Sequence, residues 1–226
     1  MEKEELQSAL QKAKDVSEKR NFKQSFDLVI NLKGLDMKKQ EHNIDAFITL
    51  PHARGRKAKV CALVSAELFE QAKQVCDFVI ISDTFEKYKE KREIKKLANG
   101  YDYFVAQANI MPKVATIFGK TFGPRGKMPN PKSGCVVPPN ANIKPLYDKL
   151  QKTIRALTKN SPLVQCGIGT EDMKLNDVAE NALAVYNAVV QALPNEKHNI
   201  KDVYVKLTMG KPVKVGEKLE VVKEIK

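Results

Sequence analysis

The chain has 226 residues, of which 42% are hydrophobic, so it can bury the cores of one or two domains. Its formal net charge of +12 and sequence pI of about 9.4 favour a polyanionic partner, either nucleic acid or an anionic membrane surface. A membrane is the weaker candidate because no apolar run approaches the roughly 18 residues that span a bilayer.

The first fifty residues predict one helix followed by two strands. The N-terminus is charged and lacks the apolar core of a signal peptide, so we expect a cytoplasmic protein. Residues 25–33 and 44–50 alternate apolar and polar side chains, which is typical of half-buried strands in an antiparallel or mixed sheet. Residues 3–19 predict an amphipathic helix whose apolar face consists of Leu6, Ala9, Leu10, Ala13 and Val16.

The middle of the chain alternates solid apolar runs with helical patterns. The runs occupy residues 60–64, 78–81 and 103–106. The predicted helices cover residues 66–75, 84–98, 109–118 and 144–157. Because solidly apolar strands are buried on both faces, this alternation predicts a parallel sheet between two layers of helices. We therefore expect a three-layer α/β domain that resembles a small Rossmann unit.

The last part of the chain returns to the first pattern. Residues 163–169 and 203–207 predict strands, and residues 213–226 predict an edge strand or a tail. Residues 177–193 predict a helix with an apolar stripe of Val178, Ala182, Val185, Tyr186, Val189 and Leu193.

Neither terminal portion makes a satisfactory domain alone, so the sequence predicts a discontinuous organisation. The fold class is α/β, with an α+β terminal domain built as a split β-α-β sheet from residues 1–56 and 160–226. The inserted α/β domain spans residues 57–159. Two chain crossings, near residues 51–57 and 158–162, would connect the domains and can act as a hinge.

A basic loop in the inserted domain is the first candidate functional site. No Asp or Glu occurs from Tyr103 to Tyr147. Glycines allow backbone N–H groups to approach a phosphate, prolines keep a loop open, and cations supply charge. The loop is therefore a candidate surface for a polyanion, and a solvated loop without a partner is the alternative. Its candidate residues are Gly123, Arg125, Gly126, Lys127 and Lys132.

Two further basic segments have simpler interpretations. Residues 54–59 carry a cluster of Arg and Lys that either contacts backbone phosphates or is a solvated hinge. Residues 87–96 are also rich in Lys, but acids at Glu86, Glu90 and Glu93 are interleaved at helical spacing. Such pairs predict a solvated helix.

An enzyme is the alternative from another function class. Residues 119–121, Gly-Lys-Thr, match the end of a phosphate-binding P-loop, but Val114 occupies the position of its first glycine. Met128 replaces the required hydroxyl after the second Gly-Lys pair. A nucleotide-dependent enzyme using residues 119–127 thus rests on half a motif. The four cysteines form no CxxC pair and the three histidines are far apart, so we predict neither a metal site nor a cofactor.

A short segment after the last strand is the second candidate site. In Thr208-Met209-Gly210-Lys211 the glycine permits close approach of another backbone, and methionine offers a soft apolar surface to a base or ribose. A turn with a core methionine is the alternative. Phe22, just before the first strand, has the same two interpretations.

These segments carry a resemblance to a known family. Residues 123–132, Gly-Pro-Arg-Gly-Lys-Met-Pro-Asn-Pro-Lys, resemble the signature of the L-one family of large-subunit ribosomal proteins. Residues 203–210 look like that family's C-terminal strand and its Thr-Met-Gly tip. The resemblance covers nearly the whole chain and is of the archaeal type.

The resemblance implies a non-enzymatic, RNA-binding ribosomal protein in the cytoplasm, with no membrane partner. Members of the family bind large-subunit rRNA and form the mobile stalk near the tRNA exit site, where they assist release of deacylated tRNA. Many also bind their own mRNA and repress its translation. The implied partners are therefore large-subunit rRNA, the protein's own mRNA and E-site tRNA. A regulatory RNA-binding protein outside the ribosome is a further alternative.

The resemblance also implies particular RNA contacts, mainly in the terminal domain. Lys23 and Lys211 are neighbouring phosphate candidates by charge, and the basic loop becomes a secondary RNA or tRNA surface. The family's polar position before the last strand is Asp202 here, and an acid is a poor neighbour for phosphate. Carried over residue by residue, the contacts fall on Phe22, Ser25, Asp27, Thr208, Met209 and Gly210.

Overall fold

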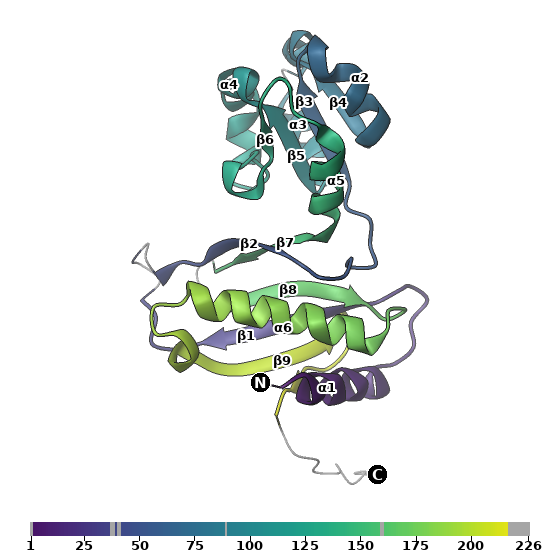
Figure 1. The fold of residues 1–226 in the computed structure, drawn as a ribbon, viewed down its shortest axis with the longest axis vertical. Helices are drawn as coiled ribbons and strands as arrows, with labels where there is room; N and C mark the ends of the chain where they lie inside the picture. Colours follow the sequence, from purple (N-terminus) through teal and green to yellow (C-terminus); the bar gives the residue numbers. More distant parts are fainter. Residues whose placement is uncertain (1, 37–38, 40–41, 89, 159–160, 217–226) are drawn as a thin grey trace. The chain divides into compact units, whose positions relative to one another are not determined.

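The computed structural model describes residues 2–36, 39, 42–88, 90–158 and 161–216, and the chain divides into two compact units (Figure 1). The terminal unit consists of Met1–Arg56 and Lys152–Lys226, and the inserted unit of Lys57–Gln151. The chain therefore returns to the terminal unit at residue 152, before the position expected from the sequence. Residues 153–157, predicted as the end of a helix, form a strand of the terminal unit.

A four-stranded antiparallel sheet in the order β10-β9-β1-β8 forms the terminal unit. Its strands are β1 (Ser25–Leu32), β8 (Leu163–Thr170), β9 (Ile200–Leu207) and β10 (Val213–Lys214). β1 pairs with β8 on one side and with β9 on the other, so the central strand comes from the N-terminal segment and both neighbours from the C-terminal segment. The predicted edge or tail at residues 213–226 begins as β10, and residues 217–226 lie outside the described residues.

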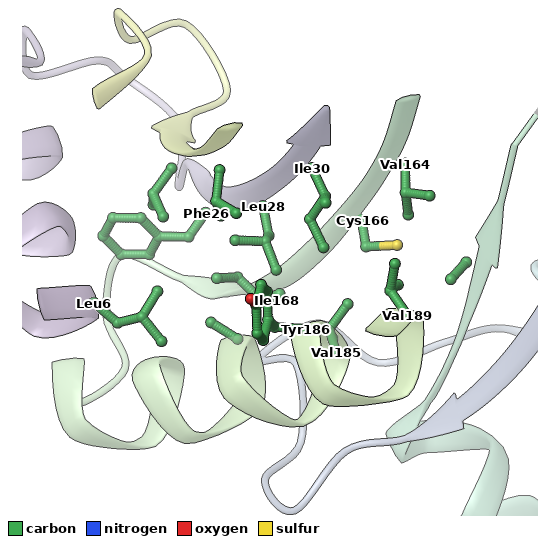
Figure 2. Close-up of a cluster of buried hydrophobic side chains, with 14 of the residues drawn as sticks. Leu6, Phe26, Leu28, Ile30, Val164, Cys166, Ile168, Val185, Tyr186 and Val189 are labelled. Atoms are coloured by element: carbon green, nitrogen blue, oxygen red, sulfur yellow. The ribbon is translucent and has the colours of Figure 1, made fainter. Parts of the chain in front are cut away.

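Two helices, α1 (Lys3–Val16) and α6 (Leu175–Ala192), cover one face of this sheet (Figure 1). The alternation in β1 is confirmed, because Phe26, Leu28 and Ile30 are buried while the residues between them are not. Figure 2 shows these side chains meeting the apolar stripe of α6 at Val185. The predicted stripes are buried, apart from Val16, which is 58% exposed at the last residue of α1.

A separate two-stranded sheet joins β2 (Asp45–Thr49) to β7 (Thr153–Leu157). The prediction of one helix over residues 144–157 is therefore wrong at its end, since α5 spans Ile143–Lys152 and the chain then turns into a strand. Thr and Ile, which open β7, favour strands, and pairing with β2 decides the outcome. The guanidinium of Arg155 binds Asp45 through Nε–Oδ1 at 2.7 Å and Nη2–Oδ2 at 2.8 Å.

A parallel sheet in the order β4-β3-β5-β6 forms the centre of the inserted unit. Helices α2 and α5 contribute to the core on one face, and α3 and α4 to the core on the other. The predicted three-layer α/β fold is thus confirmed. The strands are β3 (Val60–Val64), β4 (Phe78–Ile81), β5 (Tyr103–Gln107) and β6 (Val136–Val137), and the remaining helices are α2 (Ala66–Val75), α3 (Lys91–Gly100) and α4 (Met111–Phe122).

The predicted helix over residues 84–98 is two elements instead of one. A 3₁₀ helix, η2 (Ser82–Lys87), buries Phe85 edge-on against Phe118 at 5.3 Å, and α3 begins only at Lys91. Tyr88 ends η2 with ψ of 54°, which no helix can continue. Among the described residues, further 3₁₀ turns are η3 (Ala108–Ile110), η4 (Pro131–Ser133) and η5 (Glu196–Asn199). None of the described helices has the length and hydropathy of a membrane-spanning segment.

We predict that the terminal unit folds without the inserted unit. Gln151 accepts from the Ala58 amide at 2.8 Å and donates to the Ala58 carbonyl at 2.9 Å, so the two ends left by removing residues 57–151 lie close together. A short Gly-Ser linker in their place should give a single cooperative thermal transition by circular dichroism.

The matched control removes residues 57–159 and so also deletes β7. This variant loses buried Ile154 and Ala156 and leaves β2 unpaired, so we expect it to be less stable by about 3 kcal/mol or more. Equal stability of the two variants in urea titrations would show that β7 is not part of the terminal unit.

Candidate nucleic-acid interface

One end of the terminal sheet brings most of the predicted RNA-contacting residues together. Phe26 and Leu207 form the last cross-strand pair of β1 and β9. Beyond it the Thr208 amide donates to the Ser25 carbonyl at 3.1 Å, and the Ser25 amide donates to Thr208 Oγ1 at 3.1 Å. The Thr208 side chain therefore extends the ladder past the strand. We call this region, residues 22–25 and 208–211, the tip.

The tip exposes large apolar side chains. Met209 is 62% exposed and Phe22 is 51% exposed, which excludes the alternative that either residue belongs to the core. A Cβ atom on Gly210 would collide with Ser17 Oγ, so the end of α1 lies directly against this turn. Exposed Val16 precedes Ser17 and thus belongs to the same end of the unit, although the sequence analysis did not include it in the site.

Gln24 is a buried organising residue that the sequence analysis missed. Its Oε1 accepts from the Met209 amide at 3.2 Å, and its Nε2 donates to the Glu18 carbonyl at 3.3 Å. Its own carbonyl accepts from the Glu171 amide at 3.0 Å. The sequence could have predicted its burial, because Gln24 is in phase with the inward-facing residues of β1. A polar residue at an inward position requires buried hydrogen-bond partners.

The two lysines of the tip differ in whether an acid already pairs with them. Lys23 Nζ lies 2.6 Å from Asp172, whose hydrogen bond and negative charge raise the pKa of Lys23. Lys211 is exposed, and within the described part of the chain no ion pair involves it. Of the two predicted phosphate candidates, Lys211 is therefore the freer cation.

Asp27 lies apart from the tip, on the sheet face opposite the helices. It pairs in register with Lys206 on β9 and Gly167 on β8. Burial raises the pKa of its carboxyl group, while a hydrogen bond from Gln165 and the charge of Lys206 act in the opposite direction. Asp202, further along β9, binds Lys214 at 2.9 Å. The open face thus carries partly compensated acids, unlike the tip.

The basic loop of the inserted unit follows α4, and one of its cations is bound by backbone carbonyls of that unit. Gly123, Arg125, Gly126 and Lys132 are exposed. Lys127 instead donates from Nζ to the carbonyls of Tyr101 at 2.9 Å and Asp102 at 3.1 Å. Burial lowers the pKa of Lys127, with Asp102 opposing the shift. Lys127 therefore anchors the loop through its ammonium group, and its part in an RNA or tRNA surface stays a prediction.

The region of the half P-loop is not arranged as a phosphate cradle. Gly119 and Lys120 lie within helix α4, where the backbone amides are used by the helix. Nucleotides in Rossmann-like folds bind where the strand order reverses, at the carboxyl ends of the strands. At that edge Gln107 Oε1 accepts from Ser65 Oγ at 2.7 Å, and Glu67 places a carboxylate in the first turn of α2. An amide and an acid thus occupy the position of a phosphate.

The cysteines and the described acids are the groups that could form a metal or redox site. Among the residues that the structure describes, no three His, Cys, Asp or Glu side chains gather as metal ligands. Cys61, Cys76, Cys135 and Cys166 are all buried and free. The interpretation of Cys61 and Cys76 as core residues is confirmed.

Comparison with known proteins points to one family. Residues 10–211 match the model of the ribosomal protein L1p/L10e family. A large ribosomal subunit protein uL1 of Methanocaldococcus jannaschii is 41% identical over 216 residues, which cover 95% of this chain and 96% of that protein. The uL1 proteins of Methanothermobacter thermautotrophicus and Nanoarchaeum equitans are 41% and 42% identical, over 94% and 87% of this chain and 99% and 93% of theirs.

We predict that Gln24→Leu destabilises the terminal unit by about 1–3 kcal/mol. The substitution keeps the side-chain size but leaves the part-buried Met209 amide and Glu18 carbonyl without their partner, and an unpaired polar group shielded from water carries a cost of this order. Urea unfolding measures the effect. Gln191→Leu, in the exposed last turn of α6, is the control and should change stability by less than about 0.5 kcal/mol. Equal effects of the two substitutions would contradict the role of Gln24.

Proposed function

The chain belongs to the ribosomal protein L1p/L10e family, of the archaeal type, and on this basis we propose that it is an RNA-binding structural protein of the large ribosomal subunit. Proteins of this family are not enzymes, and the filled strand edge at Gln107 agrees with that assignment. The tip of the terminal unit is the proposed contact with large-subunit rRNA.

The observation that carries this proposal is that Met209 is exposed on a hydrogen-bonded turn and that Phe22, just before β1, is exposed as well. An apolar side chain left in water gains nothing for folding, and here the backbone that carries Met209 is fixed by a hydrogen bond to buried Gln24. Methionine and phenylalanine can pack on bases and riboses, and single unpaired bases stack well on aromatic rings. Gly210 has no side chain to block close approach of the RNA, and Lys211 supplies positive charge for a phosphate beside the apolar contact.

The finer functions follow from the family resemblance and use the same surfaces. As part of the mobile stalk near the tRNA exit site, the inserted unit would present Gly123, Arg125, Gly126 and Lys132 to E-site tRNA and assist release of deacylated tRNA. Repression would follow if the tip also binds a similar RNA fold in the protein's own mRNA. One surface cannot hold both RNAs at once, so free rRNA would relieve the repression by competition.

We predict that Met209→Asp weakens binding of the rRNA fragment by about one to two decades in Kd. The carboxylate removes the apolar contact and repels phosphate, a loss of roughly 1–3 kcal/mol. Met209→Leu keeps the apolar contact and should bind within about threefold of the native chain. Filter binding beside thermal melts makes the measurement. A folded Met209→Asp variant with native affinity would remove the tip from the binding site.

Lys211→Ala should cost less affinity and lower the slope of log K against log salt by about one phosphate contact. The matched control is Lys201→Ala, because Lys201 is an exposed lysine near the opposite end of β9. Filter binding from about 50 to 200 mM salt compares the two. A change of slope as large for Lys201 as for Lys211 would mean that the cations act only through net charge.

A further inference from the structure

A hollow on the inserted unit takes no part in the function proposed above. It runs beside edge strand β4 and beneath η2 and α3, with a volume of about 650 Å³. This volume falls within the roughly 300–1,000 Å³ of typical ligand sites. The lining residues that matter here are Phe78, Lys87, Tyr88, Glu93 and Lys96.

An aromatic wall bounds the hollow. Phe78, at the start of β4, is 38% exposed, and its ring is stacked on Tyr101 at 5.7 Å with an interplanar angle of 21°. Tyr101 in turn meets buried Phe104 edge-on at 6.2 Å. The exposed ring is therefore supported from behind by the core of the unit, and it offers a fixed flat surface to whatever enters the hollow.

The charges around the hollow are not neutralised in the way that the sequence predicted. The interleaved acids were expected to pair with the lysines of residues 87–96, but among the described residues no ion pair within 4 Å joins them. α3 carries four cations, Lys91, Arg92, Lys95 and Lys96, against the single acid Glu93. Lys87 adds a further positive charge from η2. The lining itself therefore holds two cations, Lys87 and Lys96, against one carboxylate, that of Glu93.

We propose that this hollow binds an unpaired nucleotide of RNA. The base stacks on Phe78, and the flanking phosphates face Lys87 and Lys96. The Glu93 carboxylate accepts a hydrogen bond from an exocyclic amine or a ribose 2′-hydroxyl, both of which are donors. An acidic peptide would also meet the cations, but its carboxylate side chains offer no flat ring to Phe78 and no hydrogen-bond donor to Glu93. The inference rests on the proposed RNA-binding function, but it concerns a different unit and different residues.

The test uses the full chain and a single-stranded RNA nonamer with 2-aminopurine at its centre. The Met209→Asp chain should still bind this probe and quench its fluorescence by stacking. Phe78→Ala should weaken the binding about 5- to 150-fold, the usual effect of losing one stacked base. Phe78→Tyr should bind like the native chain, whereas Phe78→Leu, which keeps the apolar area without a ring, should lose the quenching.

A matched pair of charge reversals tests the position of the phosphates. Lys96→Glu, inside the hollow, should weaken binding at least fivefold more than Lys95→Glu, which makes the same charge change one position away on α3. Circular dichroism melts confirm that each variant is folded. Native binding by Phe78→Leu, equal effects of the two reversals, or displacement of the probe by deca-glutamate at equal concentration would each overturn the proposal.

The two proposals fail in different ways. If the Met209→Asp chain no longer binds the rRNA fragment but still binds the nonamer, the two RNAs use separate sites. A native chain that does not bind the rRNA fragment contradicts the proposed function. A Phe78→Ala chain that binds the nonamer normally contradicts only the nucleotide site in the hollow.

Discussion

The terminal unit depends on the hydrogen bonding of β1 to strands on both of its sides. β8 and β9 both come from the C-terminal segment but are joined only through β1, so the four-stranded sheet needs both segments. The same pairing places the start of β1 beside the end of β9, and this adjacency creates the tip. The antiparallel β2-β7 pair then lets the chain leave and return at neighbouring points, so a whole α/β unit is inserted without disturbing the sheet.

In the tip, one set of groups fixes the backbone and another set is exposed to solvent. Its hydrogen bonds are internal and use Gln24, Ser25 and Thr208, while the apolar side chains of Phe22 and Met209 remain outside. A surface whose backbone is already fixed loses little conformational entropy when it binds. The inserted unit uses the same division at Phe78, which rests on Tyr101 while its exposed ring remains available. Met209 is thus exposed beside a hydrogen-bonded frame, and Phe78 is exposed on an aromatic support.

Local patterns in the sequence predicted the elements that have one buried face. β1 and α6 were recovered because Leu28 and Val185 recur in phase with buried neighbours. Residues 153–157 were missed because their strand form depends on β2, about a hundred residues earlier in the chain. In the candidate sites, composition located the basic loop and the turn at Met209. It could not show that Lys127 points to the carbonyls of Tyr101 and Asp102, because that direction is set by packing.

The pairing of β1 with later strands also determines the order in which the two units can fold during synthesis. Its neighbours begin at residues 163 and 200, so a growing chain cannot complete the terminal sheet until almost all of it has been made. The parallel sheet within residues 57–151 pairs only within itself, so it can fold before the partners of β1, which are β8 and β9, have been synthesised. Thr208 closes the last hydrogen bonds to Ser25. A chain that terminates before residue 208 therefore lacks the tip, which is the surface that we propose for RNA contact.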